Sequence, residues 1–198
     1  MNAKFESNIR KEQIINASAE IISRLGARGL SITNIAKAVG IVPSAIYRHF
    51  ENKYEILIEI INVFSHQLNQ LCEKATQQEV NPLSRIKKIL NMHVQLLIQN
   101  RFFPILMFSE EVVLDEADIK KNFKLTINKF LGQIAANFAE AKKQNLIRKD
   151  ISDQNLTMMY MGMFLPIAAS LVILGHEAEV ISQVEANWIV FQNGVLPR

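Results

Sequence analysis

The sequence predicts an all-α protein of about nine helices. Only 7 Gly and 5 Pro are spread over 198 residues, so long stretches contain nothing that breaks a helix. Apolar residues recur at the three- and four-residue spacing of one helix face, and no segment bounded by turn signals alternates apolar with polar residues. With 49% hydrophobic and 21% charged residues, the chain can bury a core.

The first fifty residues contain three helix signals. An apolar stripe over 14–25 predicts a first helix, which ends at the Gly-Ala-Arg-Gly turn of residues 26–29. Ser31 is a good N-cap for a short second helix, and Gly40 ends it. A third helix over 43–49 begins with proline, whose fixed φ and missing N–H cost nothing in a first turn. Two short helices joined by a tight turn predict a helix-turn-helix.

The rest of the chain is again helical. Asn52 and Glu55 resemble a capping box, which opens a long fourth helix over 52–75. Later apolar stripes predict five more helices, over 83–97, from Pro104, and over 119–141, 156–174 and 180–191.

The basic charge is concentrated at the amino-terminal end. Residues 1–53 contain eight Lys and Arg against four Asp and Glu, a net +4, whereas the remaining 14 bases and 15 acids give −1. A local basic excess is expected of a surface that binds nucleic acid, although a solvated helix surface produces it too.

Two strings of residues are more specific than the helix-turn-helix pattern. Residues 26–36 read Gly-Ala-Arg-Gly-Leu-Ser-Ile-Thr-Asn-Ile-Ala, and residues 45–53 read Ala-Ile-Tyr-Arg-His-Phe-Glu-Asn-Lys, with Gly40 before and Leu57 after the second string. Over about residues 10–60 the chain resembles the amino-terminal domain of TetR-type transcriptional regulators. Beyond that, its length, helix count and the Leu-Ile-Arg-Lys-Asp segment at 146–150 are similar to the ligand-binding half of the family.

This resemblance implies two domains. A helix-turn-helix DNA-binding domain of three to four helices is expected over residues 1–54, linked through the long helix at 52–75. An α-helical effector-binding and dimerisation domain is expected over residues 55–198. The implied protein is a ligand-responsive regulator, with repression as the usual output of the family.

The residue types of the first domain fit double-stranded DNA. Tyr47, His49 and Lys53 suit phosphates, which fix register, whereas Ser44 and Arg48 are expected to carry specificity, Arg48 through a bidentate contact to guanine. Many family members have a small polar residue where Val42 stands, so the usual N-cap is missing and a thymine-methyl contact becomes available. The predicted DNA-binding residues are Ser31, Thr33, Val42, Pro43, Ser44, Ala45, Tyr47, Arg48, His49 and Lys53.

Some of these residues also have ordinary structural explanations. Tyr47 could be a core aromatic residue, and Lys53 could be a solvated charge. The small core of the first domain is expected to contain Ile35, Ala36, Ile46, Phe50 and Leu57.

No pattern of catalytic or metal-ligating residues is visible. The chain contains no dinucleotide-binding, Walker A, zincin or nucleophile-elbow motif, and the adjacent Glu110 and Glu111 diverge on a helix. We therefore predict no catalytic residues, no metal, no cofactor and no enzymatic activity. The single cysteine, Cys72, and the charges scattered through the first 15 residues predict a cytoplasmic protein without a signal peptide.

The second domain is expected to hold a small-molecule pocket between its helices. The candidate pocket residues are His93, Phe103, Met107, Phe108, Phe123, Met159, Tyr160 and Met163, each of which also suits an ordinary core. A Met- and Phe-rich lining predicts an unknown, mainly apolar effector, anchored by groups such as His93 or Tyr160.

The resemblance also implies a homodimer, in which the last two helices pair with those of a second copy. That pairing explains why residues 154–175 contain no Asp, Glu, Lys or Arg, because one side faces its own core and the other the partner. Gly162, Ala169, Trp188 and Phe191 are the interface candidates, and a two-fold dimer predicts a palindromic operator.

Two alternatives remain open from the sequence. Residues 158–175 are apolar enough to suggest a membrane-spanning helix, although we predict no membrane association. The other alternative is a helical small-molecule carrier or enzyme that uses the cavity of the second domain.

Overall fold

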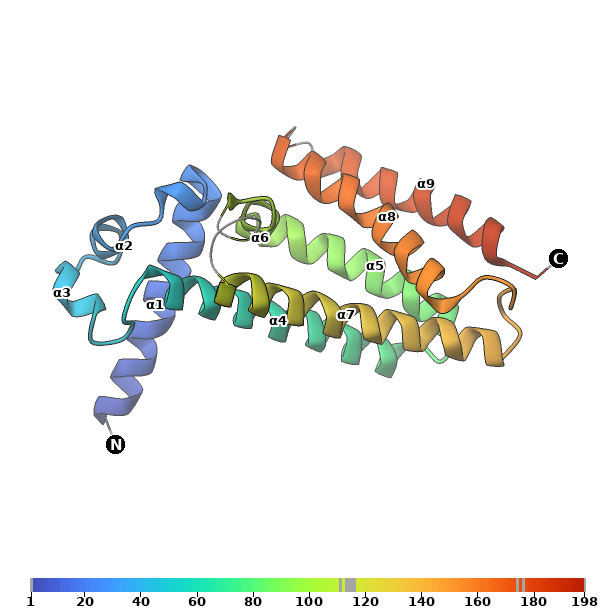
Figure 1. Ribbon diagram of the computed structural model, residues 1–198, viewed down its shortest axis with the longest axis horizontal. Helices are drawn as coiled ribbons and strands as arrows, with labels where there is room; N and C mark the ends of the chain where they lie inside the picture. Colours follow the sequence, from blue (N-terminus) through green and yellow to red (C-terminus); the bar gives the residue numbers. More distant parts are fainter. Residues whose placement is uncertain (1, 111, 113–116, 174, 176, 198) are drawn as a thin grey trace. The chain divides into compact units, whose positions relative to one another are not determined.

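The computed structural model describes residues 2–110, 112, 117–173, 175 and 177–197. Within these ranges it contains nine α-helices, one short 3-10 helix and no β-strand, as expected of an all-α protein (Figure 1). The helices are α1 (Asn2–Leu25), α2 (Ile32–Val39), α3 (Pro43–Ile46), α4 (Lys53–Gln78), α5 (Pro82–Gln99), α6 (Phe102–Met107), α7 (Ala117–Lys143), α8 (Asp153–Ile173) and α9 (Glu177–Val195).

The helices group into two compact units. The amino-terminal unit comprises Met1–Ser65 and Phe102–Thr126, and the carboxy-terminal unit comprises His66–Arg101 and Ile127–Arg198. The division falls within α4 and α7, so each of these helices supplies residues to both units. The domain boundary near residue 54 stays a prediction.

In the amino-terminal unit, α1 packs against α2 and α6, and α2 packs against α3. The five apolar residues expected in the core of the first domain, Ile35, Ala36, Ile46, Phe50 and Leu57, are all buried. Phe64 stacks on Phe103 with ring centroids 3.4 Å apart, which joins α4 to α6. The helix-turn-helix therefore shares its compact unit with α6.

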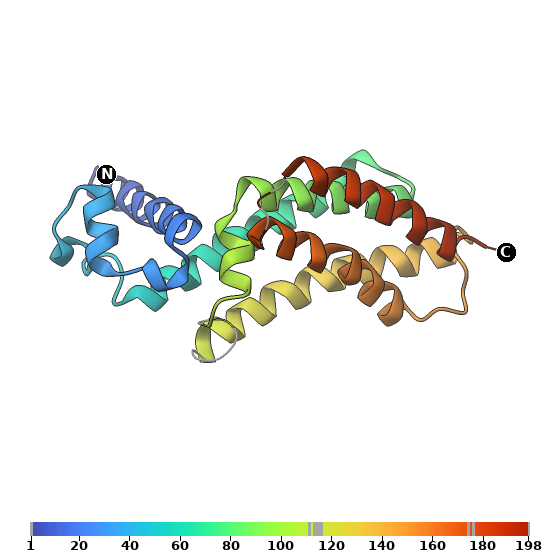
Figure 2. The same cartoon turned by 90° about the horizontal axis from the view of Figure 1, so that it is seen from above.

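In the carboxy-terminal unit, α5 packs against both α8 and α9, and α8 and α9 lie side by side (Figure 2). Part of α8 faces this core, where Leu156, Phe164 and Ile167 are buried. Others of its apolar residues, among them Met158, are exposed. The prediction that one side of this helix faces its own core is confirmed. By length and hydropathy alone, α8 could also cross a membrane.

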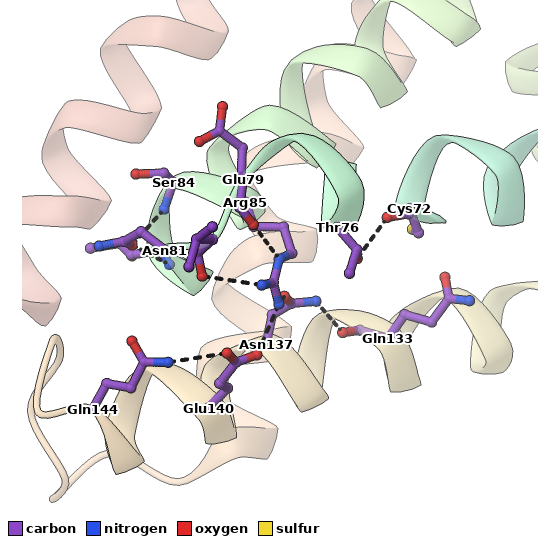
Figure 3. A network of polar contacts seen from close by, with 12 residues as sticks. Cys72, Thr76, Glu79, Asn81, Ser84, Arg85, Gln133, Asn137, Glu140 and Gln144 are labelled. Carbon is purple, nitrogen blue, oxygen red and sulfur yellow. Dashed lines mark hydrogen bonds and ion pairs between the residues drawn. The ribbon is translucent and has the colours of Figure 1, made fainter. Parts of the chain in front are cut away.

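A largely buried arginine connects helices of the carboxy-terminal unit (Figure 3). The side chain of Arg85 is 11% exposed, and its guanidinium donates to the carbonyl oxygens of Glu79 and Val80 at 3.1 and 3.2 Å. It also donates to Asn137 Oδ1 at 2.9 Å and Glu140 Oε2 at 2.8 Å. Arg85 thus ties α7 to the segment that connects α4 with α5.

The only cysteine of the chain lies on α4, near this network. Cys72 is buried and forms no disulfide. Burial raises the pKa of its thiol to about 12, with a smaller contribution from the negative charge of Glu73. The thiol is therefore protonated at neutral pH.

Two helix boundaries differ from the sequence prediction. Helix α1 begins at Asn2, well before the apolar stripe at 14–25, and its early apolar residues Phe5 and Ile9 are exposed. Because the first half of α1 packs no apolar face against a core, its sequence has no apolar periodicity from which the helix could be predicted. Helix α3 ends at Ile46 instead of near residue 49, and a turn continues it, in which the His49 N–H donates to the Ile46 carbonyl at 2.8 Å.

Candidate DNA-binding site and effector pocket

The helix-turn-helix is fixed by two caps on α2. Ser31 Oγ accepts the Asn34 N–H at 3.1 Å, which satisfies one of the free donors of the first turn. Gly40 ends the helix in the left-handed conformation, with φ of 75°, and its N–H donates to the Ala36 carbonyl. Both predicted caps are confirmed, and together they set where the chain turns into α3.

Helix α3 begins without a side-chain cap. Val42 occupies the N-cap position and makes no capping hydrogen bond, and Pro43 follows in the first turn. Buried Ile46 anchors the helix to the core, while Pro43 and Ser44 are exposed and Ala45 is half-buried. The Val42 side chain is 63% exposed, so its methyl groups are free to contact an apolar base edge.

The next residues separate clearly into core and surface. Tyr47 is 58% exposed, which excludes the core alternative, whereas Phe50 is 3% exposed. Thr33 and Arg48 are exposed. The Lys53 ammonium lies 5.0 Å from the Tyr54 ring centroid, at the start of α4. Asn52 Oδ1 accepts the N–H groups of Tyr54 and Glu55, so the predicted N-cap of this helix is confirmed.

His49 contacts a part of α1 that sequence reasoning missed. Its Nδ1 lies 3.4 Å from Ser7 Oγ, and partial burial lowers its pKa. The positive charges of Lys11, Arg10 and Arg48 lower this pKa further, in that order. Ser7 and His49 are 42 residues apart, and only the charge of Arg10 and Lys11 could have pointed to this face of α1.

A buried polar centre lies in the carboxy-terminal unit. The imidazole of His93 is 3% exposed, stacks on Phe164 at 4.0 Å and meets the edge of Phe130 at 4.6 Å between centroids. Burial lowers the pKa of His93 to about 3, so the ring is neutral at pH 7. Among the described residues, Nδ1 has no hydrogen-bond partner.

Tyr160 belongs to the same aromatic cluster. It is fully buried, with its ring centroid 6.2 Å from that of Phe130. Burial raises the pKa of its phenol well above the usual value, and the hydroxyl has no partner within the described part of the chain. An unsatisfied buried polar group costs on the order of 1–3 kcal/mol, so His93 and Tyr160 offer polar contacts that a ligand can make.

The other pocket candidates lie elsewhere. Phe103, Met107, Phe108 and Phe123 belong to the amino-terminal unit, where Phe103 stacks on Phe123 at 5.6 Å and Phe108 is 50% exposed. Met159 and Met163 line a surface groove between α8 and α9. Sequence reasoning did not single out Phe164, although its position four residues after Tyr160 places it on the same helix face.

The α8–α9 groove has a volume of about 690 Å³, and Gly162 and Phe191 contribute to its lining. Helices α8 and α9 expose eight large apolar residues: Met158, Met159, Leu165, Val172, Ile173, Ile181, Ile189 and Val190. Ala169 is half-buried. Trp188 is 1% exposed within its own protomer, where its Nε1 donates to Gln192 Oε1 at 2.9 Å.

Comparison with known proteins identifies the family. The sequence model of the family described as bacterial regulatory proteins, tetR family, matches residues 14–60. Residues 14–60 of this chain therefore belong to a DNA-binding domain of the tetR-family type. The match covers the caps of α2, helix α3 and the start of α4, which are the elements that form the candidate DNA-binding site. This match favours a DNA-binding regulator over the alternative of a carrier or enzyme.

Two curated relatives have related sequences. The nucleoid occlusion factor SlmA of Aliivibrio fischeri (strain MJ11) is 22% identical over 183 residues, which cover 92% of this chain and 83% of that protein. The fatty acid metabolism regulator protein of Bacillus subtilis (strain 168) is 28% identical over 85 residues, or 43% of this chain and 44% of that protein.

Solved structures share the fold. The transcriptional regulator FadR of Bacillus subtilis in complex with stearoyl-CoA has a TM-score of 0.78 at 18% identity, covering 92% of this chain and 98% of that one. The fatty acid degradation regulator FadR of Bacillus halodurans has a TM-score of 0.79 at 19% identity, covering 95% and 97%.

Proposed function

We propose that the protein is a dimeric transcriptional repressor that leaves a palindromic operator when an acyl-type effector binds the carboxy-terminal unit. One observation carries the DNA-binding part. Val42, Ser44, Tyr47 and Arg48, which run from the N-cap of α3 to the turn after it, are all exposed on a helix-turn-helix whose own core is complete without them. Exposed polar and cationic side chains at these positions are free to contact phosphates and base edges.

The exposed apolar faces of α8 and α9 support a dimer. A monomer rarely leaves this many large apolar side chains exposed on two adjacent helices, and two of them, Met159 and Val190, line a groove that a second copy can fill. A two-fold dimer presents two copies of α3, which explains the expected palindrome. Trp188 supports the interface from its own core, where it packs against Phe191 at 5.5 Å.

The chemistry of the buried polar centre suggests the class of effector. His93 and Tyr160 are both neutral at pH 7, so this centre offers hydrogen bonds without a positive charge. A buried carboxylate needs a cation to compensate its lost hydration, whereas a thioester or ester carbonyl does not. The centre therefore favours a long-chain acyl ester or thioester, which agrees with the stearoyl-CoA bound to the similar FadR structure.

Release of the operator follows if the effector binds one conformation of the protein more tightly than another. An effector that binds one conformation more tightly shifts the protein toward it, and if that conformation fits the operator less well, DNA affinity falls. Linkage then requires the operator to lower effector affinity by the same factor.

The test begins with selection of bound duplexes from a random DNA pool. An enriched palindrome supports the regulator, and its absence contradicts it. Stearoyl-CoA is then titrated into the complex and should release DNA, while free coenzyme A and stearate should release far less. The substitution Tyr160→Phe should weaken the response to stearoyl-CoA about tenfold, by loss of one buried hydrogen bond, with DNA affinity unchanged. Equal release by coenzyme A alone would contradict the acyl assignment.

A further inference from the structure

The first half of α1 lies beside the candidate DNA-binding residues, and Arg10 and Lys11 of that half form no ion pair with a described carboxylate. We propose that Arg10 and Lys11 of α1 join His49 in a three-residue phosphate-binding cluster beside Arg48, called here the α1 cluster. This inference rests on the proposed DNA-binding function and adds to it a second element that holds the DNA backbone.

Contacts to the turn after α3 place α1 in this cluster. Ser7 Oγ lies 3.4 Å from His49 Nδ1, and the Lys11 ammonium lies 5.4 Å from the ring centroid of the next residue, Phe50. Because Ser7 and Lys11 are four residues apart on one helix, they lie on the same face of α1. That face therefore covers the end of the helix-turn-helix.

The cations around His49 are not paired with carboxylates in the described part of the chain. Arg10, Lys11 and Arg48 form no ion pair with any described carboxylate, and each of them disfavours protonation of His49 by repulsion. No carboxylate offsets that repulsion at His49. On the α4 side, the Glu55 carboxylate is engaged by the Glu51 N–H at 2.6 Å. Glu6 and Glu12 lie on the same half of α1, but both are exposed, and no ion pair is described between either of them and Arg10, Lys11 or Arg48. The mutual repulsion of the cations is a cost that a bound polyanion removes.

The side chains are also accessible. Lys11 and Arg48 are exposed, and Arg10 and His49 are half-buried. Each can reach a phosphate without unfolding any part of α1. A phosphate oxygen accepts from guanidinium, ammonium and protonated imidazole alike, so one stretch of DNA backbone can neutralise the cluster.

The cluster has a consequence for pH. In the free protein the pKa of His49 lies below 6.5, from partial burial and from Lys11, Arg10 and Arg48. A bound phosphate favours the protonated ring, so the pKa rises in the complex. The complex then binds more protons than the free protein, and DNA affinity increases as pH falls through the interval between the two pKa values.

The test measures DNA affinity against salt concentration for the full-length protein. The probes are the selected palindrome and a duplex of unrelated sequence. The double variant Arg10→Gln with Lys11→Gln should lower the salt-dependence slope by about 2 per protomer, since each phosphate contact contributes about 0.9. The loss should be equal on both duplexes, because phosphates carry no sequence information.

A matched control removes the same charge elsewhere. Lys74 and Lys129 are exposed helix residues of the carboxy-terminal unit, and the double variant Lys74→Gln with Lys129→Gln should leave the slope unchanged. An unchanged slope in the Arg10 and Lys11 variant, with normal palindrome binding by the wild type, overturns the cluster alone. Failure of the wild type to bind any palindrome instead overturns the proposed function.

A second measurement needs no DNA. The titration of His49, followed by the NMR signal of its Cε1 proton, should shift to higher pH in the Arg10→Gln with Lys11→Gln variant, because two repelling charges are gone. The Lys74 and Lys129 control should titrate as the wild type does. An unshifted His49 titration in a variant that is folded by circular dichroism would overturn the cluster.

Discussion

The two polar sites of this protein lie in opposite surroundings. Around α3, the polar and cationic side chains are exposed on a core that is already complete, and His49 titrates among other cations. Around α5 and α8, His93 Nδ1 and the Tyr160 hydroxyl are buried among aromatic rings and have no hydrogen-bond partner among the described residues. An exposed site can gain a highly charged partner at little cost in stability. A buried site instead reduces the stability of the free protein and is relieved by a ligand.

The largest expected effect concerns a buried polar group that does have its partners. The substitution Arg85→Met removes four hydrogen bonds of a guanidinium that is 11% exposed, to two backbone carbonyls, Asn137 and Glu140, so it should destabilise the protein by about 3 kcal/mol. Urea unfolding measures this. The matched control Lys87→Met removes an exposed ion pair to Glu185 and should cost less than about 1 kcal/mol. An equal loss of stability in Arg85→Met and Lys87→Met would contradict the distinction between buried and exposed polar groups.

The burial of the His93 imidazole should be detectable in the pH dependence of the free energy of unfolding. The pKa of His93 is about 3 in the folded protein and about 6.5 when unfolded, so below pH 6.5 the unfolded state binds more protons. Stability should therefore fall by roughly 1.4 kcal/mol per pH unit below 6.5, or about 2 kcal/mol at pH 5. The variant His93→Phe should not show this loss of stability when urea unfolding at pH 5 is compared with urea unfolding above pH 6.5. A pH profile identical to the wild type would place His93 outside the buried centre.

At the exposed site, a substitution is expected to change the affinity for DNA and not the stability of the fold. Arg48→Ala should cost about 1–3 kcal/mol of operator affinity and relax the preference at one base pair, as measured by fluorescence anisotropy on operator variants. Its melting temperature should stay that of the wild type, because Arg48 is exposed. The control Arg24→Ala removes another exposed arginine of the same unit, whose pair to Glu20 at 3.7 Å is exposed too. An equal loss of operator affinity in the Arg48→Ala and Arg24→Ala variants would contradict the base contact predicted for Arg48.

The smallest expected effect comes from the same substitution, Tyr→Phe, made once at the buried site and once at the exposed site. Tyr160→Phe removes a buried hydroxyl that has no partner in the described structure, so it should stabilise the free protein by about 1 kcal/mol. Tyr47→Phe removes a hydroxyl from an exposed ring and should leave the melting temperature unchanged while weakening DNA binding. Destabilisation by Tyr160→Phe would mean that this hydroxyl is satisfied in the free protein.

The sequence predicted best what depends on neighbouring residues. The caps at Ser31, Gly40 and Asn52 and the missing cap at Val42 are set by the chemistry of a few adjacent positions, and all four are as predicted. The burial of Phe50 and the family also followed from a short string of residues.

Contacts between distant segments were beyond the reach of a pattern. The approach of Ser7 to His49 and the stacking of His93 on Phe164 join residues far apart in the sequence. The grouping of α6 with the helix-turn-helix is likewise a property of packing. The roles predicted for the pocket and interface residues stay predictions.

The single buried thiol has a practical consequence. Because the pKa of Cys72 is about 12 and the side chain is covered, maleimide reagents should leave it unmodified in the folded protein. No cysteine-free background is then required. A cysteine placed at Val80, which is 90% exposed, would accept a spin label or dye on an otherwise natural chain. Distances between two such labels in a dimer could then be followed as operator and acyl compound are added.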